Sequence, residues 1–458
     1  MRKRILAALI SGVMLAASLT ACSDSATTSS VEESSTVSVS STEESSTESE
    51  ESSVPETDAP ETEAPETDAP ETDPPETDAP ETSAPEKEPE TDTKTALEFA
   101  QQLMPGWNLG NQLEAVSGST PSETAWGNPT ITEDIILAVK DAGFKSVRIP
   151  VSYLSKIGEG PTYTVDAAWL DRIAEVVDMC VDNGMYAIIN MHGDGYHSIS
   201  GGWLLCDADN QTEITDKYGK VWAQIADKFK DYDEHLIFES MNEEFDGSYG
   251  AINNEYYENI NTYNQTFVDN VRAAGGYNAK RYLLCPGWNT DINATTENET
   301  FRVPEDSEGR VMVSVHYYDP YEFCLKESAK GIVRWGEALA GQNKKTTWGD
   351  ETYLDEQFDK LYDKFISKGI PVIIGEYGTI DKSSFDERNT IYRAYYAEYV
   401  NYAASQRQIV TVMWDNGYNG VYGHAVFSRN TCEQTQPEII AGIMRGVNAD
   451  SAPKAPTD

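Results

Sequence analysis

Two glutamates in the sequence lie at the ends of apolar segments that have the length of buried strands. Glu243 follows the segment that begins at His235 (HLIFESMN), and Glu376 lies near the end of the segment that begins at Pro371 (PVIIGEYG). Two carboxylates that flank one bond can act as a proton donor and as a nucleophile or base, which is what hydrolysis of a glycosidic bond requires. The pattern therefore predicts a two-glutamate glycoside hydrolase site, provided that the fold brings both segment ends together.

Other apolar segments also end in polar or aromatic residues, and these candidates are Arg148, His192, Asn242, His316, Tyr318 and Trp414. Charge and hydrogen bonding from Arg148 and Tyr318 would keep Glu376 ionised. Asn242 can hydrogen-bond a sugar 2-hydroxyl, and the indole of Trp414 can offer an apolar face to a sugar ring. Glu243 must begin the reaction protonated, which partial burial and a nearby carboxylate favour.

Eight strand-length segments would position these residues. Short apolar segments begin near residues 106, 146, 186, 235, 281, 311, 371 and 409, and amphipathic helical patterns follow most of them. Several helical patterns end in glycine, as helix C-termini commonly do. Eight strand–helix units in this length predict a (β/α)8 TIM barrel, whose active-site groups lie on the loops at the carboxyl ends of the strands. A doubly wound open sheet is the alternative, but no GxGxxG motif follows the first segment.

The first 22 residues have the features of a bacterial lipoprotein signal peptide. Basic residues at positions 2–4 precede an apolar run from Ile5 to Leu19, and Cys22 follows a small residue, Ala21. This pattern predicts cleavage before Cys22 and lipidation of that cysteine, so that the mature chain is anchored at the cell surface. Ordinary secretion with an incidental cysteine is the alternative.

Residues 23–94 form an acidic segment rich in Ser, Thr, Pro and Glu, with a proline at every fifth position from Pro55 to Pro85. Such a composition predicts a disordered, extended linker. A formal net charge of −43 for the whole chain argues against nucleic acid or an anionic membrane surface as a partner. We therefore expect a neutral substrate, membrane contact through the N-terminal lipid alone, and a monomer. Residues 95–450 would form the catalytic domain, and residues 451–458 a tail.

The motifs NLGN, SVRIPVSY, NMH, FESMNE, SVHYY, IIGEYG and VMWDNG, in this order, resemble glycoside hydrolase family 5 over essentially all of residues 95–450. The stretches TAWGNP and GDGYHSISGGWLL resemble its bacterial endoglucanase branch, which acts on β-1,4-glucans and has members that take xyloglucan, mixed-linkage glucan or xylan. The resemblance implies Glu243 as acid/base and Glu376 as nucleophile of a retaining mechanism, without a cofactor. It also implies that the six candidates named above surround the reacting sugar.

The chain departs from the family pattern at two positions. Gly193 stands where a second histidine often follows the first, and Asp194 or His197 could fill that space. Glu244 stands where the motif usually has proline, and we expect its side chain to turn outward. His192 and His316 lie on separate segments without HxH or HExxH spacing, so we expect no metal site.

These residues leave three functional hypotheses. The first is a retaining endo-β-1,4-glucanase. The second is a related hydrolase on the same scaffold: a xyloglucanase, licheninase, xylanase or mannanase. The third, a non-catalytic polysaccharide-binding protein, is disfavoured because both glutamates are present. Beyond Cys22 the chain has five scattered cysteines without metal-type spacing, which we expect to be mostly free thiols.

Overall fold

The computed structural model describes residues 94–329, 331–342 and 345–457. The predicted signal peptide, the lipidation site Cys22 and nearly all of the predicted linker lie outside the described residues. The described residues belong to one compact unit. Within them, no helix combines the length and the apolar character that crossing a membrane would need.

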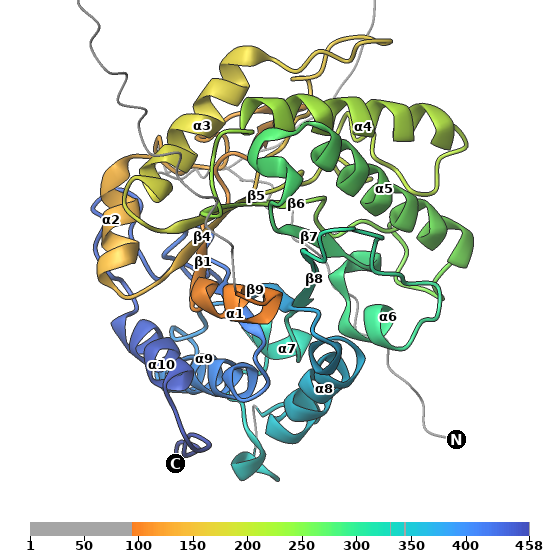
Figure 1. Cartoon of the computed structure of the whole chain (residues 1–458). Helices are drawn as coiled ribbons and strands as arrows, with labels where there is room; N and C mark the ends of the chain where they lie inside the picture. Colours follow the sequence, from red (N-terminus) through yellow and green to blue (C-terminus); the bar gives the residue numbers. More distant parts are fainter. Residues whose placement is uncertain (1–93, 330, 343–344, 458) are drawn as a thin grey trace, which may run out of the picture. The chain divides into compact units, whose positions relative to one another are not determined.

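Eight parallel strands close into a barrel, in the order β1-β10-β9-β8-β7-β6-β5-β4 (Figure 1). This confirms the predicted TIM barrel and excludes the open sheet. All residues of these eight barrel strands except Tyr186 are buried, as expected for strands that are covered on both faces. The strands are β1 (Gly106–Asn108), β4 (Ser146–Ile149), β5 (Tyr186–Ile189), β6 (Leu236–Glu239), β7 (Leu283–Pro286), β8 (Val311–Tyr317), β9 (Val372–Tyr377) and β10 (Val410–Met413).

Amphipathic helices surround the barrel and bury their apolar faces against it (Figure 1). The principal helices are α2 (Glu133–Asp141), α3 (Ala167–Val181), α4 (Gln211–Lys228), α5 (Asn254–Ala273), α6 (Ile292–Thr296), α8 (Glu351–Lys364), α9 (Asn389–Ser405) and α10 (Pro437–Val447). The five described cysteines are free thiols, as the sequence predicts.

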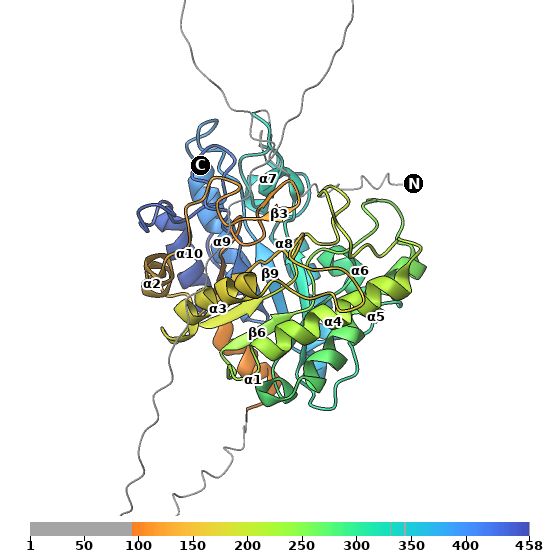
Figure 2. The same ribbon diagram turned by 90° about the horizontal axis from the view of Figure 1, so that it is seen from above.

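The two ends of the barrel differ. At the amino-terminal end of the strands, α1 (Ala96–Ala100) covers the barrel, and the ring of Phe99 stacks on Tyr282 with a centroid distance of 3.6 Å. Figure 2 shows α1 at one end, with the short strand β3 (Thr120–Pro121) and α7 (Tyr321–Cys324) at the other. The loops at the carboxyl end are thus free to form a site.

Most of the strands end earlier than the apolar segments suggest. Because β5 ends at Ile189 and β6 at Glu239, His192, Asn242 and Glu243 lie on the loops that follow. By contrast, His316 lies within β8 and Glu376 within β9. The site is therefore made of both strand and loop residues.

Candidate active site

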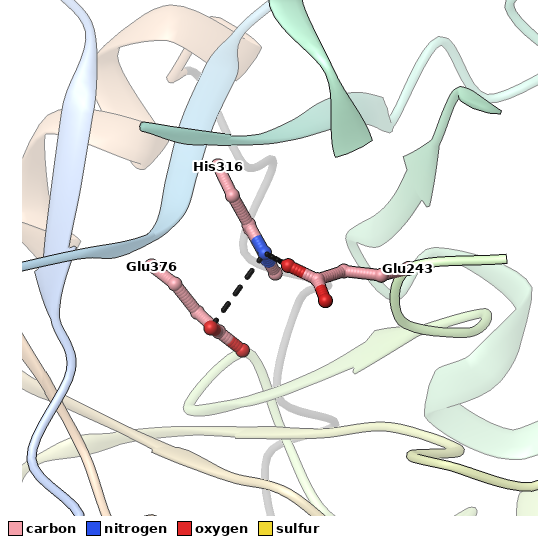
Figure 3. Close-up of side chains that lie close together, drawn as sticks. All are labelled: Glu243, His316 and Glu376. Atoms are coloured by element: carbon pink, nitrogen blue, oxygen red, sulfur yellow. Dashed lines mark hydrogen bonds and ion pairs between the residues drawn. The ribbon is translucent and has the colours of Figure 1, made fainter. Parts of the chain in front are cut away.

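The side chains of Glu243 and Glu376 converge on His316 at the mouth of the barrel (Figure 3). The Nδ1 atom of His316 lies 2.8 Å from Glu243 Oε1 and 3.7 Å from Glu376 Oε2. One carboxylate oxygen from each glutamate lies within 4.8 Å of the other. Carboxyl groups roughly 5–5.5 Å apart are typical of retaining glycosidases, whereas inverting enzymes leave roughly 6.5–9.5 Å for a water molecule. The separation therefore fits the retaining geometry.

A bulge in β9 helps to place Glu376. His316 of β8 pairs with Glu376, although the residue before it, Val315, pairs with Ile374, so β9 carries one extra residue, Gly375. A Cβ atom at Gly375 would lie 3.2 Å from His316 Nε2. Bulges re-aim side chains next to active sites. Here the extra residue turns Glu376 into the barrel mouth, and glycine leaves room for His316.

Arg148 of β4 lies at the centre of the polar network and has no exposed surface. Its Nε donates to Glu239 at 2.6 Å, and its Nη1 donates to Glu376 at 2.8 Å and to Asn108 at 3.0 Å. Its Nη2 donates to the side-chain oxygen of Asn242 at 2.6 Å. Arg148 thus positions the expected nucleophile and the residue before the expected acid/base.

The carboxylate of Glu376 has two hydrogen-bond donors. Arg148 donates to Oε1, and the hydroxyl of Tyr318 donates to Oε2 at 2.9 Å, as the sequence analysis predicts for this pair. Burial raises the pKa of Glu376 from its ordinary value, while the charges of His316 and Arg148 and the hydrogen bond from Tyr318 act to lower it. These contacts favour the charged form that a nucleophile needs.

Tyr196 links Glu243 to Asn242, and the sequence analysis did not single it out. Its hydroxyl donates to Glu243 Oε2 at 3.4 Å and accepts a hydrogen bond from the side-chain amide of Asn242. The amide of Asn242 is therefore held between Tyr196 and Arg148. His316 contacts one carboxylate oxygen of Glu243 and Tyr196 contacts the other, which fixes the direction of the carboxyl group.

His192 and Trp414 lie against each other at the barrel mouth, with ring centroids 6.2 Å apart and an angle of 12° between the planes. Burial, followed by the nearby charges of Arg148 and His316, lowers the pKa of His192 well below its usual range, so its ring is neutral. Trp414 is partly buried and directly follows β10. The structure thus brings both residues to the same rim as the glutamates.

Asp194 and His197 do not replace the second histidine of the family pattern. Asp194 is fully buried and accepts hydrogen bonds from the backbone N–H of Tyr153 and from Trp203 Nε1, so it anchors the loop after β5. His197 is partly exposed and lies 3.0 Å from Asp207. Gly193 has a φ of 83°, a left-handed conformation that a histidine would adopt only with strain.

The prediction that Glu244 turns outward is wrong. Its side chain is 1% exposed and packs against Gly195 of the loop after β5. The expectation treated a charged residue behind the motif as a solvated loop residue. The loop after β5 instead covers Glu244, and no local feature of the sequence indicates that contact.

Three buried residues that complete the network were also missed. Glu239 accepts hydrogen bonds from Arg148, from Asn190 Nδ2 at 3.0 Å and from Ser314 Oγ at 2.7 Å. A glutamate in the apolar segment HLIFE is a usable signal, because a carboxylate in a buried strand requires a charged or hydrogen-bonding partner. Asn190 and Ser314 carry no comparable signal.

Glu243, His316 and Glu376 are also the residues, within the described part of the chain, whose ligand atoms lie close enough to hold a metal ion together. The Nδ1 atom of His316 is already hydrogen-bonded to Glu243. The hydrogen bonds described above account for the arrangement of all three, and we assign no metal to them.

Comparison with known proteins identifies the family. The family model for cellulase (glycosyl hydrolase family 5) matches residues 109–420. Endoglucanase A of Paenibacillus barcinonensis is 52% identical over 362 residues, which cover 77% of this chain and 90% of the relative. A xyloglucan-specific endo-β-1,4-glucanase of Bacteroides ovatus is 35% identical over 368 residues, 77% of this chain and 70% of that protein.

A solved structure is equally similar. The family 5 xyloglucanase from Paenibacillus pabuli, in complex with ligand, superimposes with a TM-score of 0.74 at 52% identity. The match covers 76% of this chain and 99% of that chain. With the barrel, the paired glutamates and these relatives in agreement, the chain belongs to glycosyl hydrolase family 5.

Proposed function

We propose that this protein is a retaining endo-β-1,4-glucanase that hydrolyses internal β-1,4-glucosidic bonds in cellulose or related β-glucans. The observation that carries the proposal is the short separation of the Glu243 and Glu376 carboxylates, which leaves too little room for an attacking water between carboxylate and sugar. The similarity to endoglucanases over most of the chain supports the same activity.

Hydrolysis would proceed in two displacements. In the first, Glu376 attacks the anomeric carbon while Glu243 gives its proton to the leaving oxygen, and a glycosyl ester forms on Glu376. In the second, Glu243, now a carboxylate, takes a proton from water, which attacks the anomeric carbon and releases Glu376. The contacts from His316 and Tyr196 would hold Glu243 in place for both proton transfers.

The residues around the pair would bind the reacting sugar. We propose that Trp414 supplies an apolar face and that His192, Asn242 and Tyr318 hydrogen-bond hydroxyl groups of the sugar. His192 is neutral and can donate from one ring nitrogen while accepting at the other. Arg148 has no exposed surface, so we assign it to positioning Glu376 and Asn242 instead of to contact with sugar.

The second candidate is a preference for xyloglucan. The similarity to two proteins described as xyloglucanases, one of them 52% identical over most of its length, favours this alternative. Both substrates share a β-1,4-glucan backbone, so the same pair of glutamates would serve either. Initial rates on cellulose derivatives, mixed-linkage glucan, xyloglucan, xylan and mannan separate the alternatives.

Replacing Glu376 with alanine removes the nucleophile, and we expect hydrolysis of carboxymethylcellulose to fall by on the order of 10³-fold or more. Azide should restore turnover of an aryl β-cellobioside and give the product with inverted configuration, because azide occupies the space of the lost carboxylate. Glu243→Ala should instead retain activity on aryl glycosides whose leaving group needs no proton. The exposed Glu356 provides a control, Glu356→Ala, which should behave as wild type. An active Glu376→Ala enzyme without azide would refute the assignment.

Replacing Tyr318 with phenylalanine removes one hydrogen bond to the charged form of Glu376. A hydrogen bond to a carboxylate lowers its pKa, so its loss should raise the pKa of Glu376 further. The acidic limb of the kcat/KM profile should then move to higher pH, by roughly half a unit to one unit. The exposed Tyr362, changed to phenylalanine, is the control. A shift to lower pH would contradict the proposed role of Tyr318.

We further propose that the protein is a lipoprotein held at the cell surface through Cys22, with residues 23–94 as a spacer between membrane and catalytic domain. The support is the sequence pattern around Cys22 and the repeated prolines of the spacer. A tethered enzyme would release oligosaccharides close to the cell.

A Cys22→Ala variant tests the anchor. Wild-type activity should stay with washed cells and enter the detergent phase on phase separation, because acyl chains partition into apolar surroundings. The variant should lose both properties while its specific activity is unchanged. Equal partitioning of the two forms would reject lipidation and favour ordinary secretion.

A further inference from the structure

Glu244 is a buried acidic residue that the proposed reaction does not use. Its side chain is 1% exposed, and both carboxylate oxygens are buried without a hydrogen-bond partner. A carboxylate in such a place has lost its hydration and gained nothing in return, so the neutral acid is the favoured form. Glu244 directly follows the acid/base Glu243 in the chain, and therefore belongs to the loop that carries it.

The carboxyl group of Glu244 lies against the backbone of the loop after β5. A Cβ atom built on Gly195 would lie 1.6 Å from Glu244 Oε2 and 2.3 Å from its carboxyl carbon. The absence of a side chain at position 195 thus lets the carboxyl group sit directly on the loop. The backbone oxygen of Glu244 accepts a hydrogen bond of 2.9 Å from the N–H of Asn289, which ties the same residue to the loop after β7.

The groups that interact electrostatically with Glu244 are acidic or weakly acidic. They are Asp194, Tyr196 and Cys206 from the loop after β5, Glu243 from its own loop, Tyr218 from α4 and Tyr263 from α5. Lys217 of α4 interacts with Asp194 and lies over the ring of Trp203, 3.9 Å from its centroid. A negative charge on Glu244 would therefore be repelled by Asp194 and Glu243.

The contact between Glu244 and Gly195 lies next to a residue that hydrogen-bonds the acid/base. Tyr196, the next residue, makes the hydrogen bond to Glu243 and accepts the one from Asn242. Displacement of the segment 193–196 would thus move the hydroxyl that holds the proton donor on one side.

We propose that Glu244, in its neutral form, is a positioning residue that holds the segment 193–196 against Glu243, and that loss of its proton releases this segment and sets the alkaline limit of activity. The proposal rests on the proposed function, because the segment is assigned to a catalytic acid/base.

The contribution of Glu244 to folding stability should change with pH in one direction. Burial, together with the charges of Asp194 and Glu243, raises the pKa of Glu244 well above its ordinary value. Burial also raises the pKa of Asp194, to about 6, and once Asp194 is charged it opposes ionisation of Glu244. Because the folded state binds the Glu244 proton more tightly than the unfolded state, this group makes folding less favourable as pH rises above its unfolded pKa.

The test replaces Glu244 with glutamine, which keeps the shape and cannot ionise. We expect kcat at the pH optimum to fall less than about threefold, and the alkaline limb of kcat/KM to move to higher pH by at least about half a unit. The melting temperature relative to wild type should rise as the pH increases above 4.5, the ordinary pKa of a glutamate. If the buried amide of glutamine impairs folding, Glu244→Met serves as the second variant. Methionine is also neutral and of similar size, so it should give the same shift. Glu356→Gln, at an exposed position on α8, is the matched control and should alter neither curve.

Two results would overturn the proposal. An unchanged alkaline limb means that ionisation of Glu244 does not limit activity. A shift to lower pH means that Glu244 is charged in the active enzyme and raises the proton affinity of Glu243. A failure of the proposed function is distinguishable from both, because wild type itself would then lack activity on every β-glucan tested.

Discussion

Arg148 carries a positive charge into a place without solvent, and the rest of the site is arranged around that charge. Burial works against the guanidinium, but the carboxylates of Glu239 and Glu376 outweigh it, so the pKa of Arg148 is raised. A buried charge of this kind is stable only with ionic partners and satisfied donors. Three of its nitrogens donate hydrogen bonds, and their acceptors come from β1, β6, β9 and the loop after β6. One side chain thus fixes the relative positions of four barrel segments.

The two carboxylates that pair with Arg148, those of Glu239 and Glu376, have different roles. In the proposed reaction Glu376 becomes an uncharged ester, so Arg148 lacks that counter-ion between the first and the second displacement. Glu239 is not exposed, accepts hydrogen bonds from three side chains and takes no part in bond making, so it remains to balance the charge. A buried charge whose sole partner is removed costs several kcal/mol, roughly 3–5. Because Glu239 stays charged throughout, Glu376 can lose its charge without leaving Arg148 unpaired.

Much of this arrangement could be predicted from the sequence, for identifiable reasons. Eight apolar segments with helical patterns between them specify a barrel because burial on both faces leaves a strong local signal. Polar residues after those segments meet at one rim because all the strands are parallel, which is how Glu243 and Glu376 could be paired. The bulge at Gly375 was missed, although an isolated glycine inside an apolar strand segment is a usable signal for a bulge or a close approach.

The errors share one physical origin, namely contacts between segments far apart in the sequence. Glu244 was expected in solvent because the covering loop lies about 50 residues earlier in the chain. Tyr196 gave no signal because its role depends on its loop meeting the loop after β6, where it contacts Glu243 and Asn242. Glu239 did give a signal, because it is a carboxylate inside a buried segment. A search for the cation that balances its charge could have identified it.

In the proposed mechanism Glu376 attacks the sugar and Glu243 transfers the proton. The most direct measurement is to trap the glycosyl-enzyme with an activated 2-deoxy-2-fluoro-β-cellobioside and to map the labelled peptide by mass spectrometry. Fluorine at carbon 2 slows both displacements, and the good leaving group allows the first to proceed, so the ester accumulates. We expect a single label, on Glu376. A label on Glu243, or no label together with release of the inverted anomer as the first product, would contradict this mechanism.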